Sequence, residues 1–153
     1  MALMIPSNLE EFTTEGEGRF YQFVEKVAKP DSQFFCWYCP DINGREPDFV
    51  LFSQQTGLFI FEVKDWALDQ VRVANSQYFE LSMGVRIERK KNPLHQAREY
   101  LEELREKIKA DGHFMSKDSI HAGSLRIPIN YGIVLPNIAK HEYSEKGYGD
   151  VIG

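Results

Sequence analysis

The sequence places two carboxylates and a lysine in segments that are otherwise built for burial. Asp48 directly follows Pro47. After thirteen intervening residues, Glu62 and Lys64 flank Val63 within an apolar run. Charged side chains seldom enter such strands without a partner or a role. Because alternate residues of a strand share a face, we expect Glu62 and Lys64 to project together.

Asp48 joins this pair only if the connecting hairpin has a suitable register. An odd-length loop around Gln55 places Asp48 on the face of Glu62. An even-length loop does so only with a β-bulge, for which Gly57 is the candidate.

Two carboxylates held close together repel each other, and a hard cation such as Mg²⁺ or Mn²⁺ removes that cost. Such a metal activates water and polarises a phosphoryl oxygen, while Lys64 would orient the nucleophile or stabilise transition-state charge. Phosphodiester hydrolysis is the chemistry that this set would serve. The plainer interpretation is a partly buried salt bridge of Glu62 with Lys64, with Asp48 ending a turn.

Two further side chains are candidates for the same site. Glu17 fits a capping box with Thr14, yet it also continues the apolar helical row of Phe20 and Val24, which directs it to the interior. Gln96 lies in the first turn of an expected second helix, where it could reach a metal-bound water or a phosphate. The commoner role for such a residue is that of a surface glutamine.

The pattern along the chain predicts one mixed α/β unit. Helices are expected from Thr14 to before Pro30, and from a cap at Asn92 through Ile108. Strands are expected over 33–39, 49–53, 58–63 and 129–135, with weaker ones over 71–73, 78–81 and 85–87. The early sheet is expected to be antiparallel, with the weaker strands extending its meander and the late strand joining it. Residues 111–128 are expected to form a flexible connection.

Composition bounds the class of protein. The chain has 153 residues, of which 42% are hydrophobic and 13% aromatic, which predicts one folded domain. No segment resembles a membrane span or a signal peptide, and a cytoplasmic location is expected. The only two cysteines, Cys36 and Cys39, are expected to be buried structural thiols on opposite sides of a strand rather than a redox or zinc pair.

The charge is unevenly distributed. The net charge is -5, but residues 86–109 hold eight basic and five acidic side chains, so the remainder carries the negative excess. A basic strip beside an acidic pocket would suit a protein that holds a metal ion and receives a polyanion. A solvated helix face is the plainer explanation.

Several motifs resemble the nuclease-related domain family, NERD, a branch of the PD-(D/E)xK nuclease superfamily. They occur in the family's order and spacing: TEGEGRF over 14–20, EPDFV over 46–50, FEVKDW over 61–66 and NPLHQ over 92–96, followed by YGIVLP over 131–136. The resemblance covers about residues 14–137.

The resemblance implies a restriction-endonuclease-like core, a mixed sheet flanked by helices, with Mg²⁺ dependence and a role in DNA processing or repair. It makes Glu17, Asp48 and Glu62 the acidic, metal-binding positions, Lys64 the catalytic lysine and Gln96 the supporting amide. Family members are often the amino-terminal part of larger proteins, including helicases. We therefore expect a nuclease domain over 1–137, with 138–153 as a tail or a linker to a downstream domain.

Two other functions remain open from the sequence. The same fold could act as a catalytically weak DNA-binding or tethering module of a larger helicase-like protein. It could also be an interaction scaffold whose acidic pocket is an ion-pair network.

Overall fold

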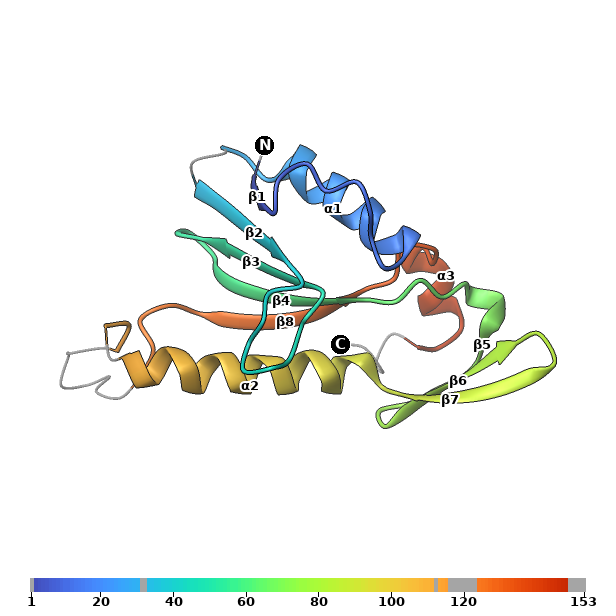
Figure 1. The fold of residues 1–153 in the computed structure, drawn as a ribbon. Coiled ribbons are helices and arrows are strands. Elements are labelled where there is room, and N and C mark those ends of the chain that lie inside the picture. Colours follow the sequence, from blue (N-terminus) through green and yellow to red (C-terminus); the bar gives the residue numbers. More distant parts are fainter. Residues whose placement is uncertain (1, 31–32, 112, 116–123, 149–153) are drawn as a thin grey trace.

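A computed structural model describes residues 2–30, 33–111, 113–115 and 124–148. Its main sheet has five strands in the order β1-β2-β3-β4-β8, with α1 on one face and α2 on the other (Figure 1). The strands are β1 (Leu3–Ile5), β2 (Phe34–Tyr38), β3 (Phe49–Ser53), β4 (Gly57–Val63) and β8 (Ile129–Val134), and the helices are α1 (Glu15–Val27) and α2 (Pro93–Asp111). This α/β architecture is consistent with a restriction-endonuclease-like fold.

The central strands β2, β3 and β4 are antiparallel, as expected, but the whole sheet is mixed. β1 pairs with β2 in parallel and β8 pairs with β4 in parallel. The three-residue strand β1 was not predicted from the sequence, because so short a run shows no usable alternation.

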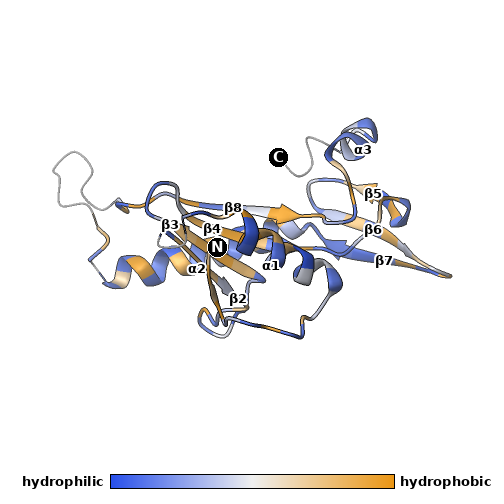
Figure 2. Cartoon of the chain, turned by 90° about the horizontal axis from the view of Figure 1, so that it is seen from above, coloured by the Kyte–Doolittle hydropathy of each residue, from blue (hydrophilic) through white to orange (hydrophobic). Residues whose placement is uncertain are grey.

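Each face of the main sheet buries its own core. On the α1 side, Val24 packs with Phe49 and Val63. On the α2 side, Leu101 packs with Ile60. Figure 2 shows the resulting concentration of hydrophobic residues on the central strands. Both helices begin as predicted, with Thr14 and Asn92 accepting from the backbone N–H groups of the first turn.

The weaker strands do not extend the meander, contrary to the sequence-based expectation. β5 (Val71–Ala74), β6 (Tyr78–Met83) and β7 (Arg86–Lys91) form a separate antiparallel sheet. The reason is that β8 pairs in parallel along β4 and occupies the edge to which a continuing meander would add. The chain instead leaves β4 through the short 3-10 helix η2 (Leu68–Gln70) and starts a new sheet.

The described part of the tail packs against this second sheet. α3 (Lys140–Glu145) lies there, and Ile138 and Tyr148 contact the small core of Val71, Phe79 and Leu81. Half of the expected connection 111–128 lies outside the described residues, and within the rest Met115 and Leu125 form an isolated bridge. None of the described helices is long and apolar enough to cross a membrane.

Candidate active site

Asp48 and Glu62 lie opposite each other where β3 begins and β4 ends. The hairpin between these strands has the odd-length loop 54–56, and its register pairs Phe49 with Phe61, which sets Asp48 across from Glu62. Gly57 adopts a positive φ of 86° but pairs with Ser53 without a bulge. The Asp48 Oδ2 atom accepts a 2.7 Å hydrogen bond from the Val63 amide. The expected convergence of the two carboxylates is therefore present.

Glu62 is fully buried, and only one of its oxygens has a partner. Its Oε2 accepts a 2.8 Å hydrogen bond from Lys64 Nζ, as the strand alternation predicts. Its Oε1 is buried and has no hydrogen-bond partner among the described residues. An orphaned buried acceptor costs roughly 1–3 kcal/mol, and more when it is charged. A cation or a proton bound at this oxygen would remove that cost.

Burial raises the pKa of both carboxyls. For Glu62, desolvation and then the negative charge of Asp48 outweigh Lys64, and the pKa rises to about 7. For Asp48, desolvation also raises the pKa, against the opposing effects of the Val63 amide and Lys64. The pair therefore binds a proton far more readily than exposed carboxyls do, and a divalent cation can take the place of that proton.

Glu17 both takes part in the cap of α1 and points into the interior, the two placements that the sequence suggested. Its backbone N–H donates to Thr14 Oγ1 at 3.2 Å and its Oε1 accepts from that hydroxyl at 3.1 Å, which forms the first-turn cap. Its Oε2 accepts a 2.6 Å bond from the hydroxyl of Tyr38, and the side chain is buried. Burial raises the pKa of Tyr38 to about 12, so this hydroxyl keeps its proton and remains a donor.

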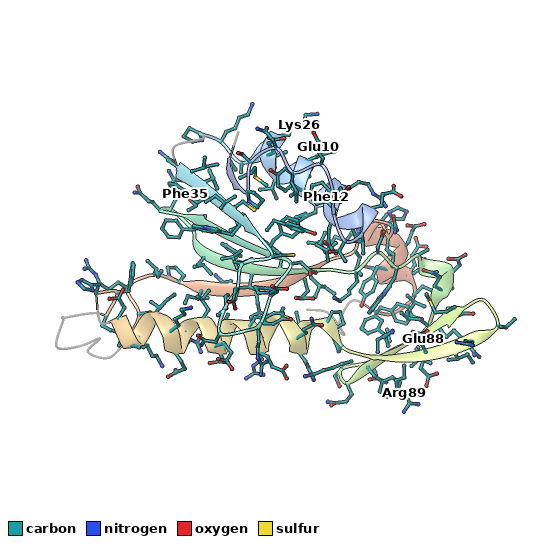
Figure 3. All side chains as sticks on the ribbon, viewed as in Figure 1. Glu10, Phe12, Lys26, Phe35, Glu88 and Arg89 are labelled. Carbon is teal, nitrogen blue, oxygen red and sulfur yellow. The ribbon has the colours of Figure 1, made fainter. Side chains whose placement is uncertain are left out.

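Tyr38 was missed by the sequence reasoning. It lies on β2, twenty-one residues from Glu17, and no local pattern links the two. The sequence placed Tyr38 only within an expected strand, 33–39. The ring of Phe12 packs edge-on against the ring of Tyr38, with 5.4 Å between the ring centroids. Phe12 lies between α1 and the sheet in Figure 3.

A hollow of about 410 Å³ opens beside these groups. Glu17 reaches it from α1 on one side, and Asp48 and Lys64 reach it from the strand ends. Its lining is completed by Thr13, Thr14, Val63, Asp65 and Trp66. The hollow brings together three of the predicted site residues, while Glu62 lies buried behind them.

Gln96 lies on α2 and lines a different hollow. By strand alternation Glu62 shares the face of Ile60, which packs against α2, so Gln96 in the first turn of α2 is on the same side of the sheet. Gln96 donates from Nε2 to the hydroxyl of Tyr100 at 3.0 Å and lines a separate hollow beside Glu46. The structure therefore places Gln96 on the α2 side of the sheet and outside the hollow of Glu17.

A second polar cluster fixes the position of α1 above the strand ends. Asp65 accepts from the backbone N–H of Gly16 at 3.2 Å and from the amide of Asn137 at 2.5 Å, and Arg19 bonds to both of these side chains. A Cβ on Gly16 would lie only 2.9 Å from Asp65 Oδ1 and 3.1 Å from Pro136, so a glycine is needed for this close approach. Sequence reasoning did not find this cluster, because its members come from three separate segments.

The arrangement of the carboxylates determines which of them could hold a metal ion. Across the described residues, no three side chains of His, Cys, Asp or Glu are grouped so that they could hold a metal ion. Asp48 and Glu62 face each other and leave an orphaned oxygen, whereas Glu17 is held by Tyr38 and Thr14. The two strand carboxylates are thus the ones whose chemistry fits a hard cation.

The two cysteines are free thiols. Cys36 is fully buried on β2, and burial raises its pKa to about 12. Cys39 is partly buried in a left-handed conformation with φ of 45°, and burial raises its pKa as well. Thiols with raised pKa values are poor nucleophiles. Cys36 is the buried thiol that was predicted, whereas Cys39 lies beyond the end of β2 and is only partly buried.

Comparison with protein families identifies the class to which this fold and site belong. The model of the nuclease-related domain, NERD, matches residues 13–136, which is most of the chain. The protein therefore belongs to the nuclease-related domain family. Comparison with curated proteins and with solved structures gives no match.

Proposed function

We propose that this chain is a Mg²⁺- or Mn²⁺-dependent nuclease domain that hydrolyses phosphodiester bonds in DNA. The observation that carries the proposal is the buried Glu62 carboxylate, which faces Asp48, bonds to Lys64 at 2.8 Å and keeps an orphaned oxygen. Membership of a nuclease-related family supports the same chemistry. A purely structural ion pair would not call for a second carboxylate opposite the first.

Asp48 and Glu62 would hold the cation between them. A bound divalent ion would supply an acidified water and charge stabilisation for a phosphoryl oxygen. Lys64 donates a charge-assisted hydrogen bond at the edge of the hollow, and its remaining N–H donors can orient a nucleophile or bind a phosphate oxygen. The Val63 amide holds Asp48 in place, so that its other oxygen is left for the ion.

Glu17 would support this site from α1. Tyr38 and Thr14 fix its carboxylate at the rim of the hollow, where it can accept a hydrogen bond from a water or a substrate hydroxyl. Gln96 would act from the α2 side, where the free N–H groups of a helix start favour an anion.

The test is cleavage of labelled single-stranded and duplex DNA with Mg²⁺ or Mn²⁺, against EDTA. Wild type should cut in the presence of metal, and Lys64→Ala should not. If wild type and Lys64→Ala leave DNA equally intact at high enzyme concentration, the nuclease proposal fails.

A DNA-binding module without catalysis is the second candidate. The Glu62–Lys64 salt bridge favours it, because a paired lysine and glutamate also suffice as a structural element. Salt-sensitive DNA binding that persists without any cleavage would support this candidate.

A further inference from the structure

The three-stranded sheet differs from the rest of the chain in charge. Residues 71–91 hold five basic and two acidic side chains, whereas the rest of the chain holds thirteen basic and twenty-one acidic ones. Five of the six residues of the edge strand β7 are exposed. A protein of net negative charge therefore presents one basic strand at its periphery.

The turn between β6 and β7 also exposes apolar side chains. Val85 is fully exposed, Ile87 is 57% exposed and Met83 is 45% exposed. Single exposed apolar residues are common, but these three follow one another around one turn, with Met83 and Ile87 on opposite faces of the hairpin. Figure 2 shows this turn projecting beyond the rest of the molecule. Packing within the fold does not account for the cluster.

The basic groups of the hairpin are accessible to a ligand. Arg86 makes no salt bridge with any described residue. Lys90 pairs with Glu88 at 2.6 Å, and Arg89 lies over the Tyr78 ring at 4.1 Å; both basic side chains are more than half exposed. Figure 3 places Glu88 and Arg89 at the end of the molecule remote from Lys26. Exposed ion pairs are worth about 0–1 kcal/mol, so phosphate can displace the acidic partners at little cost.

The hairpin is fixed relative to the candidate site. Trp66 lines the hollow of Glu17 and Asp48. Its ring packs against that of Phe79 on β6, with 5.2 Å between the ring centroids. At the other end, Asn92 bonds to the backbone of Asn75 and Gln77 between β5 and β6, and it also caps α2. The hairpin therefore keeps a fixed position relative to the hollow.

We propose that the β6–β7 hairpin, residues 78–91, is an arm that binds the sugar-phosphate backbone of duplex DNA next to the phosphate held at Asp48 and Glu62. This inference rests on the proposed function. A two-stranded ribbon fits a groove of duplex DNA, and basic side chains with an apolar tip suit its phosphates and sugars. An anionic membrane would also attract such a tip, but the connection through Trp66 to the hollow favours DNA.

The test uses the full chain and a labelled duplex several helical turns long, with binding followed by fluorescence anisotropy in EDTA over a range of salt. The arm variant is Arg86→Glu with Lys90→Glu. The control is Lys26→Glu with Lys29→Glu, an equal charge change at two exposed positions on and just after α1. We expect the arm variant to bind at least roughly tenfold more weakly, with a salt slope smaller by about two, while the control stays within about twofold of wild type.

Equal losses in the two variants, or wild-type binding to anionic vesicles but not to duplex, would overturn the arm. Cleavage with Mn²⁺, measured in parallel, separates this inference from the proposed function. If wild type binds duplex through the arm but never cuts, only the nuclease proposal fails. If wild type cuts and the arm variant keeps the same KM and salt slope, only the arm fails.

Discussion

The two sheets of this protein break the usual rules of burial in opposite ways. The five-stranded sheet is covered by helices on both faces, and it buries the charged Glu62 completely. The three-stranded sheet packs only one face, and it leaves the apolar Val85 and Ile87 exposed. Burying the charge of Glu62 costs stability, and exposing these apolar side chains contributes none. These two departures are the basis of the roles proposed above: chemistry for the large sheet and DNA contact for the small one.

The comparison also shows how the two regions depend on each other. Asp48 lies just before β3, and Glu62 lies near the end of β4, after which the chain leaves for the small sheet. The aromatic contact of Trp66 with Phe79 joins the hollow to the small core. The following experiments separate the contributions of the two sheets.

The largest effect is expected at the facing carboxylates of Asp48 and Glu62. Asp48→Asn removes a negative charge from the cation site while keeping the hydrogen-bonding shape, so cleavage should fall by at least roughly 1000-fold. Gel-based nuclease assays with Mn²⁺ measure this. The control is Asp69→Asn, an exposed acid in η2, which should cut at the wild-type rate. Similar rates for the two variants would remove Asp48 from the mechanism.

The next effect concerns the core of the small sheet. Phe79 is fully buried, so Phe79→Ala should lower the free energy of unfolding by about 3–5 kcal/mol. Ile87→Ala, on the exposed strand of the same sheet, should change it by about 0.5 kcal/mol or less. Urea denaturation compares the two. A small loss for Phe79→Ala would mean that the second sheet contributes little to the folded state.

A third effect should appear in the dependence of stability on pH. The pKa of Glu62 is raised from 4.5 to about 7 in the folded state. A raised carboxyl pKa means that the folded state binds the proton more tightly, so stability should fall as pH rises from about 4.5 to 7, by on the order of 3 kcal/mol. Urea unfolding in EDTA at several pH values measures this loss. The free energy of unfolding of Glu62→Gln should depend less on pH than that of wild type. An identical pH dependence in the two proteins would mean that Glu62 is not the group whose pKa is raised.

The smallest effect is expected at Tyr38. Tyr38→Phe removes the hydroxyl that donates to Glu17, at a cost in stability of about 1.5–3 kcal/mol, because the acceptor is charged and buried. Cleavage should fall by roughly tenfold, as is usual when an outer hydrogen-bond partner is lost. Tyr21→Phe is a suitable comparison, since Tyr21 donates to the Pro6 carbonyl and not to the site. A larger activity loss in Tyr21→Phe would argue against this role of Tyr38.

Much of the large sheet was predictable from the sequence because its signals are local. The capping residues Thr14 and Asn92, and the odd-length loop centred on Gln55, each act within a few residues. The shared face of Glu62 and Lys64 follows from strand alternation alone. These local rules place Glu62 and Lys64 together, whereas Asp48 joins them because the loop 54–56 has the odd length that was one of two alternatives open from the sequence.

The remaining features depend on contacts between distant segments. Because β8 pairs in parallel with β4, the strands β5, β6 and β7 form a separate sheet. The bond from Tyr38 to Glu17 and the bonds of Asp65 to Gly16 and Asn137 join residues that are 21 to 72 positions apart in the chain, and no periodicity encodes such pairs.

By itself, the sequence determined that Glu62 and Lys64 share a face, since strand alternation is a property of neighbouring residues, and it left the face of Asp48 dependent on the hairpin register. Only the tertiary structure decided how deeply Glu62 is buried, which oxygen it leaves without a partner, and that Glu17 is held by Tyr38. The physical reason is that desolvation and hydrogen bonding depend on every segment that surrounds an atom, and those segments come together only when the chain folds.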